Sequence, residues 1–313
     1  MLTSFPAAVQ LLHVPDGFLN VPISVICWVV TLIVLYFAVK QAQQDFDERL
    51  VPLAGIMAAF IFAGQMLQFP VLFGISGHLV GATLAFVVLG PWVGTLAMTA
   101  VISLQALIFQ DGGLVVMGAN ILIMGIVPGF VGYGVYQMVK DQSREVKLGI
   151  TAVAAWFSVL IAALVTALLL GFSGTTALGL AIPAMLGVHA LIGIGEALIT
   201  VAALSFIIQT RPQLLTDDAP AGSGKWIVSG IILALLVLLL APFASGSPDG
   251  LEWVAEQSGF IGAALEAPYE LLPDYTIPGM GESGSSTILA GLIGALVVAA
   301  VTFGIGRILR RQN

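Results

Sequence analysis

Long apolar segments separated by short polar stretches follow one another from residue 21 to residue 308. About 20 consecutive apolar residues are needed for a helix to cross a bilayer, whereas the strands of a membrane barrel alternate apolar and polar positions. The pattern therefore predicts an all-α, polytopic membrane protein with about nine transmembrane helices. The expected spans are residues 21–40, 51–69, 78–90, 92–109, 115–139, 148–171, 183–209, 226–244 and 287–308.

The third and fourth spans meet at Gly90-Pro91. Residues 78–109 are too many for one ordinary crossing, and a proline in a helix interior removes a backbone hydrogen bond. We expect two helices joined by a tight turn at this point. A single tilted and kinked helix is the alternative.

Charged residues are scarce. The chain has 313 residues, of which 10 are Lys or Arg and 17 are Asp or Glu, so 9% are charged and the net charge is −7. A soluble domain has about 25% charged residues, so a water-soluble enzyme and a disordered protein are both excluded. The negative balance argues against a nucleic-acid partner. The single cysteine, Cys27, excludes a disulfide framework and a cysteine-based metal cluster.

The basic residues predict the orientation in the membrane, because Lys and Arg gather in cytoplasmic loops. If the N-terminus is outside, all ten lie inside or at the inner helix ends, and the C-terminus is cytoplasmic. These residues are Lys40, Arg49, Lys140, Arg144, Lys147, Arg211, Lys225, Arg307, Arg310 and Arg311.

A polar segment rich in proline and glycine, residues 210–225, predicts a cytoplasmic linker. Seven expected helices precede it in a domain of residues 1–209, and two follow in a module of residues 226–313. An outer loop at 245–286 joins those two and holds seven acids and no base, so it is either a solvated loop or a surface that attracts cations. The acids are Asp249, Glu252, Glu256, Glu266, Glu270, Asp274 and Glu282.

Three histidines fall on the outer side of this topology. His13 precedes the first span, His78 is expected to open the third, and His189 is expected about two turns into the seventh. A lone helical histidine is usually a packed, hydrogen-bonded residue. Three on one side instead favour a metal site, since imidazole suits zinc, copper, nickel and cobalt.

Four other polar residues are candidates to support such a site. Glu196 follows His189 by seven residues, which places it on the same helix face about 10 Å deeper, where it must be paired or protonated. Asn120 could orient a ligand histidine or link two helices. Asp111 begins an outer turn, and Asp16 lies in a Pro-Asp-Gly turn beside His13.

The stretch from His13 to Leu19, His-Val-Pro-Asp-Gly-Phe-Leu, resembles the start of a known family. It is the M-type substrate-binding (S) component of energy-coupling factor transporters for cobalt or nickel, which typically begins Met-His-Ile-Pro-Asp-Gly-Phe/Tyr-Leu. Residues 247–253, Ser-Pro-Asp-Gly-Leu-Glu-Trp, resemble the small N-type or PDGLE component that is often fused to it in nickel-type systems. The resemblance continues in residues 77–81, 104–114, 118–120 and 188–200, and so covers nearly the whole chain.

This resemblance implies a planar metal site made of nitrogen atoms. Its ligands would be a terminal amine at Leu12, the deprotonated amide and the imidazole of His13, and the imidazole of His78. His189 is expected nearby as a further ligand, a neighbour of the ligands or a relay. Planar nitrogen donors suit Ni²⁺ and Cu²⁺, whereas Mg²⁺ and Ca²⁺ prefer oxygen.

The sequence departs from the family pattern at its beginning, because twelve residues precede His13 and the nitrogen of Leu12 is an amide as written. We expect a mature chain that starts at position 12. A start codon misread as leucine is the favoured cause, and proteolytic removal of residues 1–11 is the alternative. Native protein that keeps residues 1–11 in a mass spectrum and still binds metal tightly would contradict this expectation.

The resemblance also implies a function, that of the metal-capturing subunit of an ATP-driven importer in the cell (cytoplasmic) membrane. Its substrate would be Ni²⁺ or Co²⁺, with no permanent cofactor. Since the sequence has no Gly-x4-Gly-Lys-Ser/Thr motif, the chain is not expected to be an enzyme, and a transmembrane coupling (T) subunit and two ATP-binding cassette ATPases would be separate chains. Small residues in 81–85 and 94–97 would allow close contact with the coupling subunit. A proton-coupled transporter acting alone through Glu196 and His189 is the alternative.

Overall fold

Helices make up most of the chain, as the apolar segments predict. The structure, a computed structural model, describes residues 13–44, 50–210, 225–281 and 283–310. Within these ranges six helices are long and apolar enough to cross a membrane, and two shorter apolar helices accompany them. The all-α membrane class is confirmed. The expected number of nine crossings is approximate, since the described residues contain six long and two shorter apolar helices. The six spans are Val21–Gln44, Pro91–Phe109, Met117–Gln137, Arg144–Phe172, Leu178–Gln209 and Gly284–Leu309, and the shorter helices are Leu50–Met66 and Ile227–Phe243.

The elements follow the order of the apolar segments, with π-helical turns inside two of the spans and a small hairpin at residues 69–77. The α-helices are α1 (Val21–Gln44), α2 (Leu50–Met66), α3 (Ala82–Leu89), α4 (Pro91–Leu104), α5 (Met117–Asn120), α6 (Val127–Gln137), α7 (Arg144–Phe172), α8 (Leu178–Thr210), α9 (Lys225–Leu240), α10 (Gly250–Gln257) and α11 (Gly284–Arg310). The other elements are the π-helices η1 (Gln105–Phe109) and η2 (Ile121–Ile126), the 3-10 helices η4 (Ala241–Phe243), η5 (Ile261–Ala263) and η6 (Pro273–Tyr275), and the antiparallel strands β1 (Phe69–Pro70) and β2 (Ser76–Gly77).

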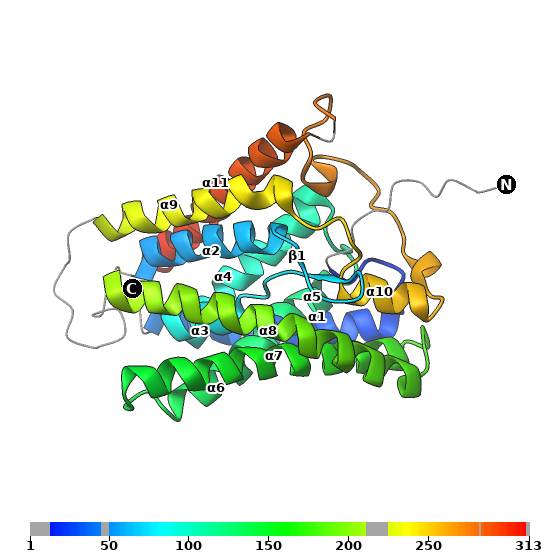
Figure 1. Cartoon of the computed structure of the whole chain (residues 1–313), viewed down its shortest axis with the longest axis horizontal. Coiled ribbons are helices and arrows are strands. Elements are labelled where there is room, and N and C mark those ends of the chain that lie inside the picture. Colours follow the sequence, from blue (N-terminus) through cyan, green and yellow to red (C-terminus); the bar gives the residue numbers. More distant parts are fainter. Residues whose placement is uncertain (1–12, 45–49, 211–224, 282, 311–313) are drawn as a thin grey trace.

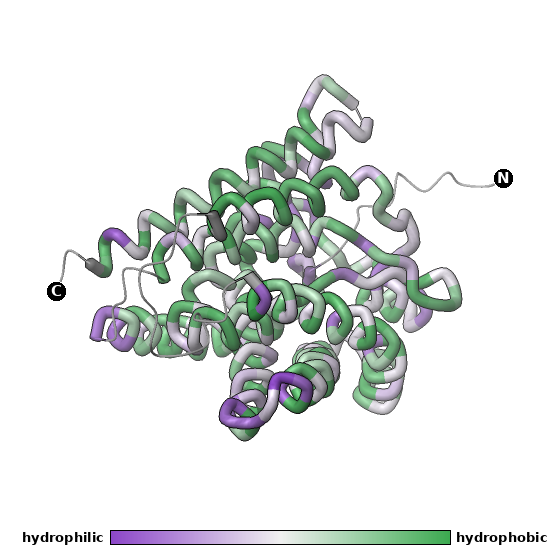
Figure 2. Tube along the Cα trace, turned by 60° about the vertical axis from the view of Figure 1, so that its left-hand side comes forward, coloured by the Kyte–Doolittle hydropathy of each residue, from purple (hydrophilic) through white to green (hydrophobic). Residues whose placement is uncertain are grey.

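The long helices lie roughly side by side, and their connections gather at two opposite ends of the molecule (Figure 1). The α10 helix lies at one end, and the end of α8 and the start of α9 lie at the other. Hydrophobic residues cover the helices, while hydrophilic ones gather near the loops (Figure 2). This arrangement suits helices that satisfy their own backbone groups inside a bilayer and expose their ends to water.

The α3 and α4 helices are separate and meet at Gly90, as the Gly90-Pro91 pair predicts. Gly90 has φ 76° and ψ 166°, which no helix contains, and Pro91 is the first residue of α4. The α3 helix has only eight residues, all of them buried, and is about 12 Å long. The helix is therefore too short to cross the membrane by itself, and the expected span 78–90 consists of the non-helical residues 78–81 followed by this helix.

Two helix starts differ from the expectation. His78 does not open a helix, because it lies in the segment between β2 and α3, which begins at Ala82. The α8 helix begins at Leu178 and contains Pro183, where the helix was expected to start. His189 therefore lies about three turns into α8, not two. Apolarity alone does not tell a buried extended segment from a buried helix, so neither boundary could be read from the pattern.

The small-residue stretches 81–85 and 94–97 are buried within the chain. A Cβ atom added to Gly94 would lie 2.8 Å from the ring of Phe86, so the glycine allows α3 and α4 to pack closely. These stretches are not available to a coupling subunit, which corrects the expected partner surface.

The C-terminal helices pack on the N-terminal part of the chain. Both α9 and α11 contact α2. A Cβ atom added to Gly294 of α11 would lie 2.1 Å from the ring of Phe62, and one added to Gly55 of α2 would lie 3.3 Å from the carbonyl oxygen of Ala299. Small residues thus let α11 approach α2 closely. Residues 211–224 of the expected linker lie outside the described residues.

Candidate metal site

Asp16 anchors the turn that follows His13. Its carboxylate accepts hydrogen bonds from the backbone N–H groups of Leu114 (3.0 Å), Val115 (2.9 Å) and Val116 (3.1 Å). Three amide donors stabilise one ionised carboxylate strongly. The Pro-Asp-Gly turn is thereby fixed to the segment that leads into α5.

Asn120, in α5, holds the residue next to His13. Its side-chain oxygen accepts from the N–H of Val14 (3.1 Å), and its amide nitrogen donates to the carbonyl of Val14 (2.9 Å). Asn120 therefore bonds to the backbone beside His13 and not to the imidazole ring that it was expected to orient.

The His13 ring is fully enclosed and fixed by Asp111. Its Nδ1 lies 2.6 Å from Oδ1 of Asp111, and the two side chains are 0% and 3% exposed. Its Nε2 is buried and has no hydrogen-bond partner among the described residues. A neutral imidazole that donates through Nδ1 to a carboxylate keeps its lone pair on Nε2, which is the usual way in which proteins prepare a metal-binding histidine.

A tyrosine from the acidic loop supports Asp111. The hydroxyl of Tyr275 donates to Oδ2 of Asp111 (2.5 Å) and accepts from Gln105 (3.2 Å), and its ring stacks on Phe109 with centroids 4.7 Å apart. Burial, and then the Asp111 charge, raise the pKa of Tyr275 well above its ordinary value, so its hydroxyl stays a donor. Tyr275, which has a left-handed φ of 55°, was missed by the sequence reasoning because nothing in its local spacing marks it.

His78 lies beside His13, with ring centroids 5.9 Å apart. Its Nδ1 bonds the carbonyl of Leu79 (3.1 Å). Val80 and Gly81, which follow Leu79, are fixed by Glu196 of α8. Its carboxylate accepts hydrogen bonds from the N–H groups of Val80 (2.7 Å) and Gly81 (2.9 Å). Glu196, which the sequence predicts to be paired or protonated, thus bonds to the backbone that carries His78.

His189 forms part of the wall of the same cavity, and its Nδ1 bonds the carbonyl of Met185 one turn earlier (2.8 Å). A carbonyl oxygen only accepts, so the bond places a proton on Nδ1. His189 is thus close to the other two histidines, as expected, while its role as ligand or neighbour stays a prediction.

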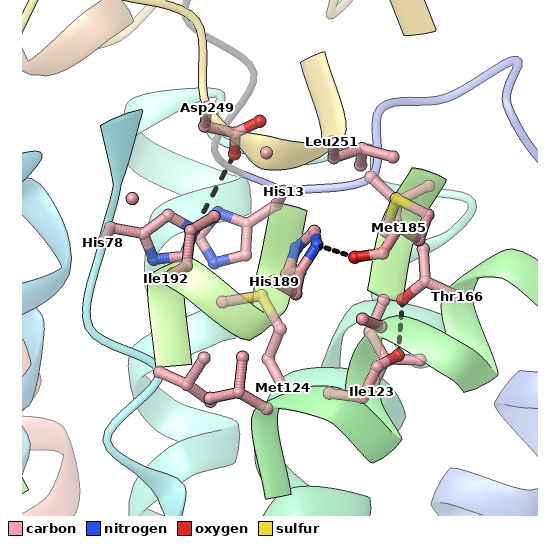
Figure 3. A pocket seen from close by; sticks show the side chains of 17 residues that line it. His13, His78, Ile123, Met124, Thr166, Met185, His189, Ile192, Asp249 and Leu251 are labelled. Carbon is pink, nitrogen blue, oxygen red and sulfur yellow. Dashed lines mark hydrogen bonds and ion pairs between the residues drawn. The ribbon is translucent and has the colours of Figure 1, made fainter. Parts of the chain in front are cut away.

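The cavity between these histidines measures about 70 Å³. Figure 3 shows Asp249 above the rings of His13 and His78, with His189 across from them. Among the described residues, no three His, Cys, Asp or Glu side chains converge closely enough to hold an ion in this conformation. A chelate through the amide and Nδ1 of His13 would displace the Asp111 contact. The expected amine ligand, Leu12, lies outside the described residues.

The acidic loop 245–286 is only partly solvated. Asp249 and Glu252 are 3% and 5% exposed, and the segment is tied down by backbone bonds such as Leu265 N to Asp16 O (2.8 Å) and Leu272 N to Ile108 O (3.0 Å). Burial is the main cause that raises the pKa of Asp249 to about 8. Four acids are exposed, namely Glu256, Glu266, Glu270 and Asp274, and Glu282 lies outside the described residues.

Replacing Tyr275 with phenylalanine is expected to lower thermal stability and weaken metal binding. The change leaves Oδ2 of the buried Asp111 without its donor, which costs about 1–3 kcal/mol, and it loosens the carboxylate that orients His13. Thermal unfolding and metal titration of the detergent-solubilised protein measure both effects. The control is Tyr269→Phe, which removes an exposed bond to Leu107 O and is expected to change neither. Unchanged metal affinity in Tyr275→Phe would contradict the orienting role.

Comparisons with known proteins agree with this architecture. The family model described as "Cobalt uptake substrate-specific transmembrane region" matches residues 13–214, and the PDGLE domain model matches residues 224–311. A putative fused nickel transport protein NikMN of Archaeoglobus fulgidus is 34% identical over 96% of this chain and 99% of its own length. A fused nickel transport protein NikMN of Rhodobacter capsulatus is 28% identical over 94% of this chain and 97% of its own.

A solved structure is similar as well. The crystal structure of a truncated transition metal transporter matches with a TM-score of 0.58 and 33% identity, over 63% of this chain and 99% of that one. With two family models covering its two parts in sequence order, the chain belongs to the family of cobalt uptake substrate-specific transmembrane regions, in the fused form that carries a PDGLE domain at its C-terminal end.

Proposed function

We propose that this membrane protein captures Ni²⁺ or Co²⁺ on the outer side of the cytoplasmic membrane, as the substrate-binding subunit of an ATP-driven importer. The ion is its transported substrate and not a resident cofactor. Relatives named as nickel and cobalt transport proteins support the substrate class.

The observation that carries the proposal is the buried, unpartnered Nε2 of His13 beside the His78 ring. A buried polar atom without a partner costs about 1–3 kcal/mol. A metal ion that used its lone pair would recover that cost. The carboxylate on Nδ1 would increase the basicity of the ring, which strengthens such a bond.

The composition of the cavity supports a transition-metal ion in preference to Mg²⁺ or Ca²⁺. Imidazole nitrogen is the main donor that the described residues offer there, and the hard cations need several oxygen ligands. An amine at Leu12 would add a further nitrogen if the ion bound Nδ1 of His13 in place of Asp111. Cobalt and nickel have neighbouring affinities for such donors, and the relatives that share the fused PDGLE domain are named for nickel.

ATP-driven transport requires other chains, since this sequence lacks a phosphate-binding loop. We propose a transmembrane coupling subunit and two ATP-binding cassette ATPases as partners. The proton-coupled alternative receives no support from Glu196, because both of its oxygens accept backbone N–H groups and are engaged in positioning the chain.

Uptake of radioactive Ni²⁺ into proteoliposomes tests this function. We expect ATP-dependent uptake when the chain is reconstituted with the coupling subunit and ATPases of its host, and none with ATPases that cannot hydrolyse ATP. Uptake by the chain alone, driven by a proton gradient, would contradict the proposal and establish the secondary transporter instead.

A further inference from the structure

Asp249 belongs to the PDGLE domain, yet its carboxylate lies in the wall of the histidine cavity (Figure 3). It is 3% exposed and directly precedes α10. The four exposed acids of the loop are not among the residues that line the cavity. One residue of the C-terminal domain is thus placed where an ion would bind in the N-terminal domain.

The position of Asp249 is fixed by contacts between the two domains. The N–H of Ser76, two residues before His78, donates to the carbonyl of Pro248 (2.9 Å), and its hydroxyl donates to the carbonyl of Ser247 (2.7 Å). The residue after Asp249 is a glycine, and a Cβ atom at Gly250 would lie 2.9 Å from the His189 ring. The segment therefore docks tightly against both histidine-bearing elements.

The two oxygens of Asp249 face different partners. Oδ1 accepts from the N–H of Glu252 (2.7 Å) and caps α10. Oδ2 lies 3.8 Å from Nε2 of His78. That distance is too long for a hydrogen bond, but it is shorter than the roughly 4.2 Å that two metal–ligand bonds span end to end. The capping bond occupies the first oxygen, while the second is the oxygen that faces the ring of His78.

We propose that Asp249 binds the transported ion through Oδ2, so that the PDGLE domain completes the site formed by His13 and His78. This inference rests on the proposed function. His78 donates through Nδ1 to a carbonyl, so the lone pair of its ring is on Nε2, the atom that faces the carboxylate. An ion between Nε2 and Oδ2 would be attracted by both.

Charge also favours an oxygen ligand at this place. Two neutral imidazoles would leave both positive charges of the ion uncompensated in a cavity lined mainly by apolar side chains, where an unpaired charge is costly. One carboxylate removes half of that charge. The Asp111 carboxylate is already bonded to His13 and Tyr275, so Asp249 is the acid that remains for the ion.

The test is metal titration of the full-length protein carrying Asp249→Asn or Asp249→Ser. Both replacements retain an N-cap acceptor for α10, and only the charge and the metal-binding oxygen are lost. Co²⁺ alone serves as the probe, because its visible absorption responds to the ligands, and Ni²⁺ affinity is measured in parallel. Glu256→Gln is the matched control, since it removes one charge from an exposed position on the same helix.

We expect both Asp249 variants to bind about 10- to 100-fold more weakly with an altered Co²⁺ spectrum, while Glu256→Gln and the melting temperatures stay unchanged. Wild-type affinity and spectrum in the Asp249 variants, with binding lost in His13→Ala, would overturn this proposal and leave the proposed function standing. If His13→Ala also binds normally, the proposed function fails with it.

Discussion

His13→Ala and His78→Ala are each expected to abolish tight binding of Ni²⁺ and Co²⁺. His13 contributes a buried Nε2 without a partner, and its ring lies 5.9 Å from the ring of His78. Loss of a residue that merely supports a ligand costs about 10- to 100-fold in metal affinity, and loss of a ligand itself should cost at least as much. Isothermal titration of the purified full chain with each ion measures the effect.

A matched variant separates metal binding from packing at His13. In His13→Asn the amide nitrogen occupies roughly the place of Nδ1 and retains a donor for Asp111, while nothing replaces Nε2. We expect this variant to melt near the wild-type temperature and still to lose metal. His189→Ala is expected to lose less affinity than either ligand variant. Wild-type affinity in both His13 variants would show that the site lies elsewhere.

Glu196→Ala is expected to produce the largest loss of stability. The change leaves the buried N–H groups of Val80 and Gly81 without an acceptor, and each such group costs about 1–3 kcal/mol. The segment that carries His78 loses its attachment to α8, so metal affinity should fall together with stability. Thermal unfolding in detergent and metal titration measure the two effects on the same sample.

Two further variants serve as controls for Glu196→Ala. Glu196→Gln keeps one acceptor oxygen and is expected to lose about half as much stability. Thr200→Val, one turn later in α8, removes a buried hydroxyl that has no partner among the described residues and should leave stability unchanged or slightly raised. If Glu196→Ala melts like the wild type, the carboxylate is not what holds the His78 segment.

Much of the membrane architecture could be predicted because it depends on local properties. Apolar run length identified the spans, and Gly90-Pro91 identified the break between α3 and α4, since proline and positive φ act within a few residues. The start of α8 could not be located in this way, because Pro183 is accommodated inside the helix.

Only part of the candidate site could be predicted from the sequence. The side on which His13, His78 and His189 gather followed from counting the crossings. The residues of the acidic loop that meet them did not, because the bond from Tyr275 to Asp111 joins positions 164 residues apart. Hydrophobic periodicity carries no information on such pairings, and the burial of Asp249 against His78 depends on how the two domains dock.

The central claim is that one divalent ion binds between His13 and His78. Anomalous diffraction at the nickel absorption edge, from crystals of the full chain loaded with one equivalent of Ni²⁺, tests it most directly. We predict a single strong peak at about 2.0–2.2 Å from an imidazole nitrogen of each histidine, with Asp249 beside it. A peak that contacts neither histidine would contradict the account.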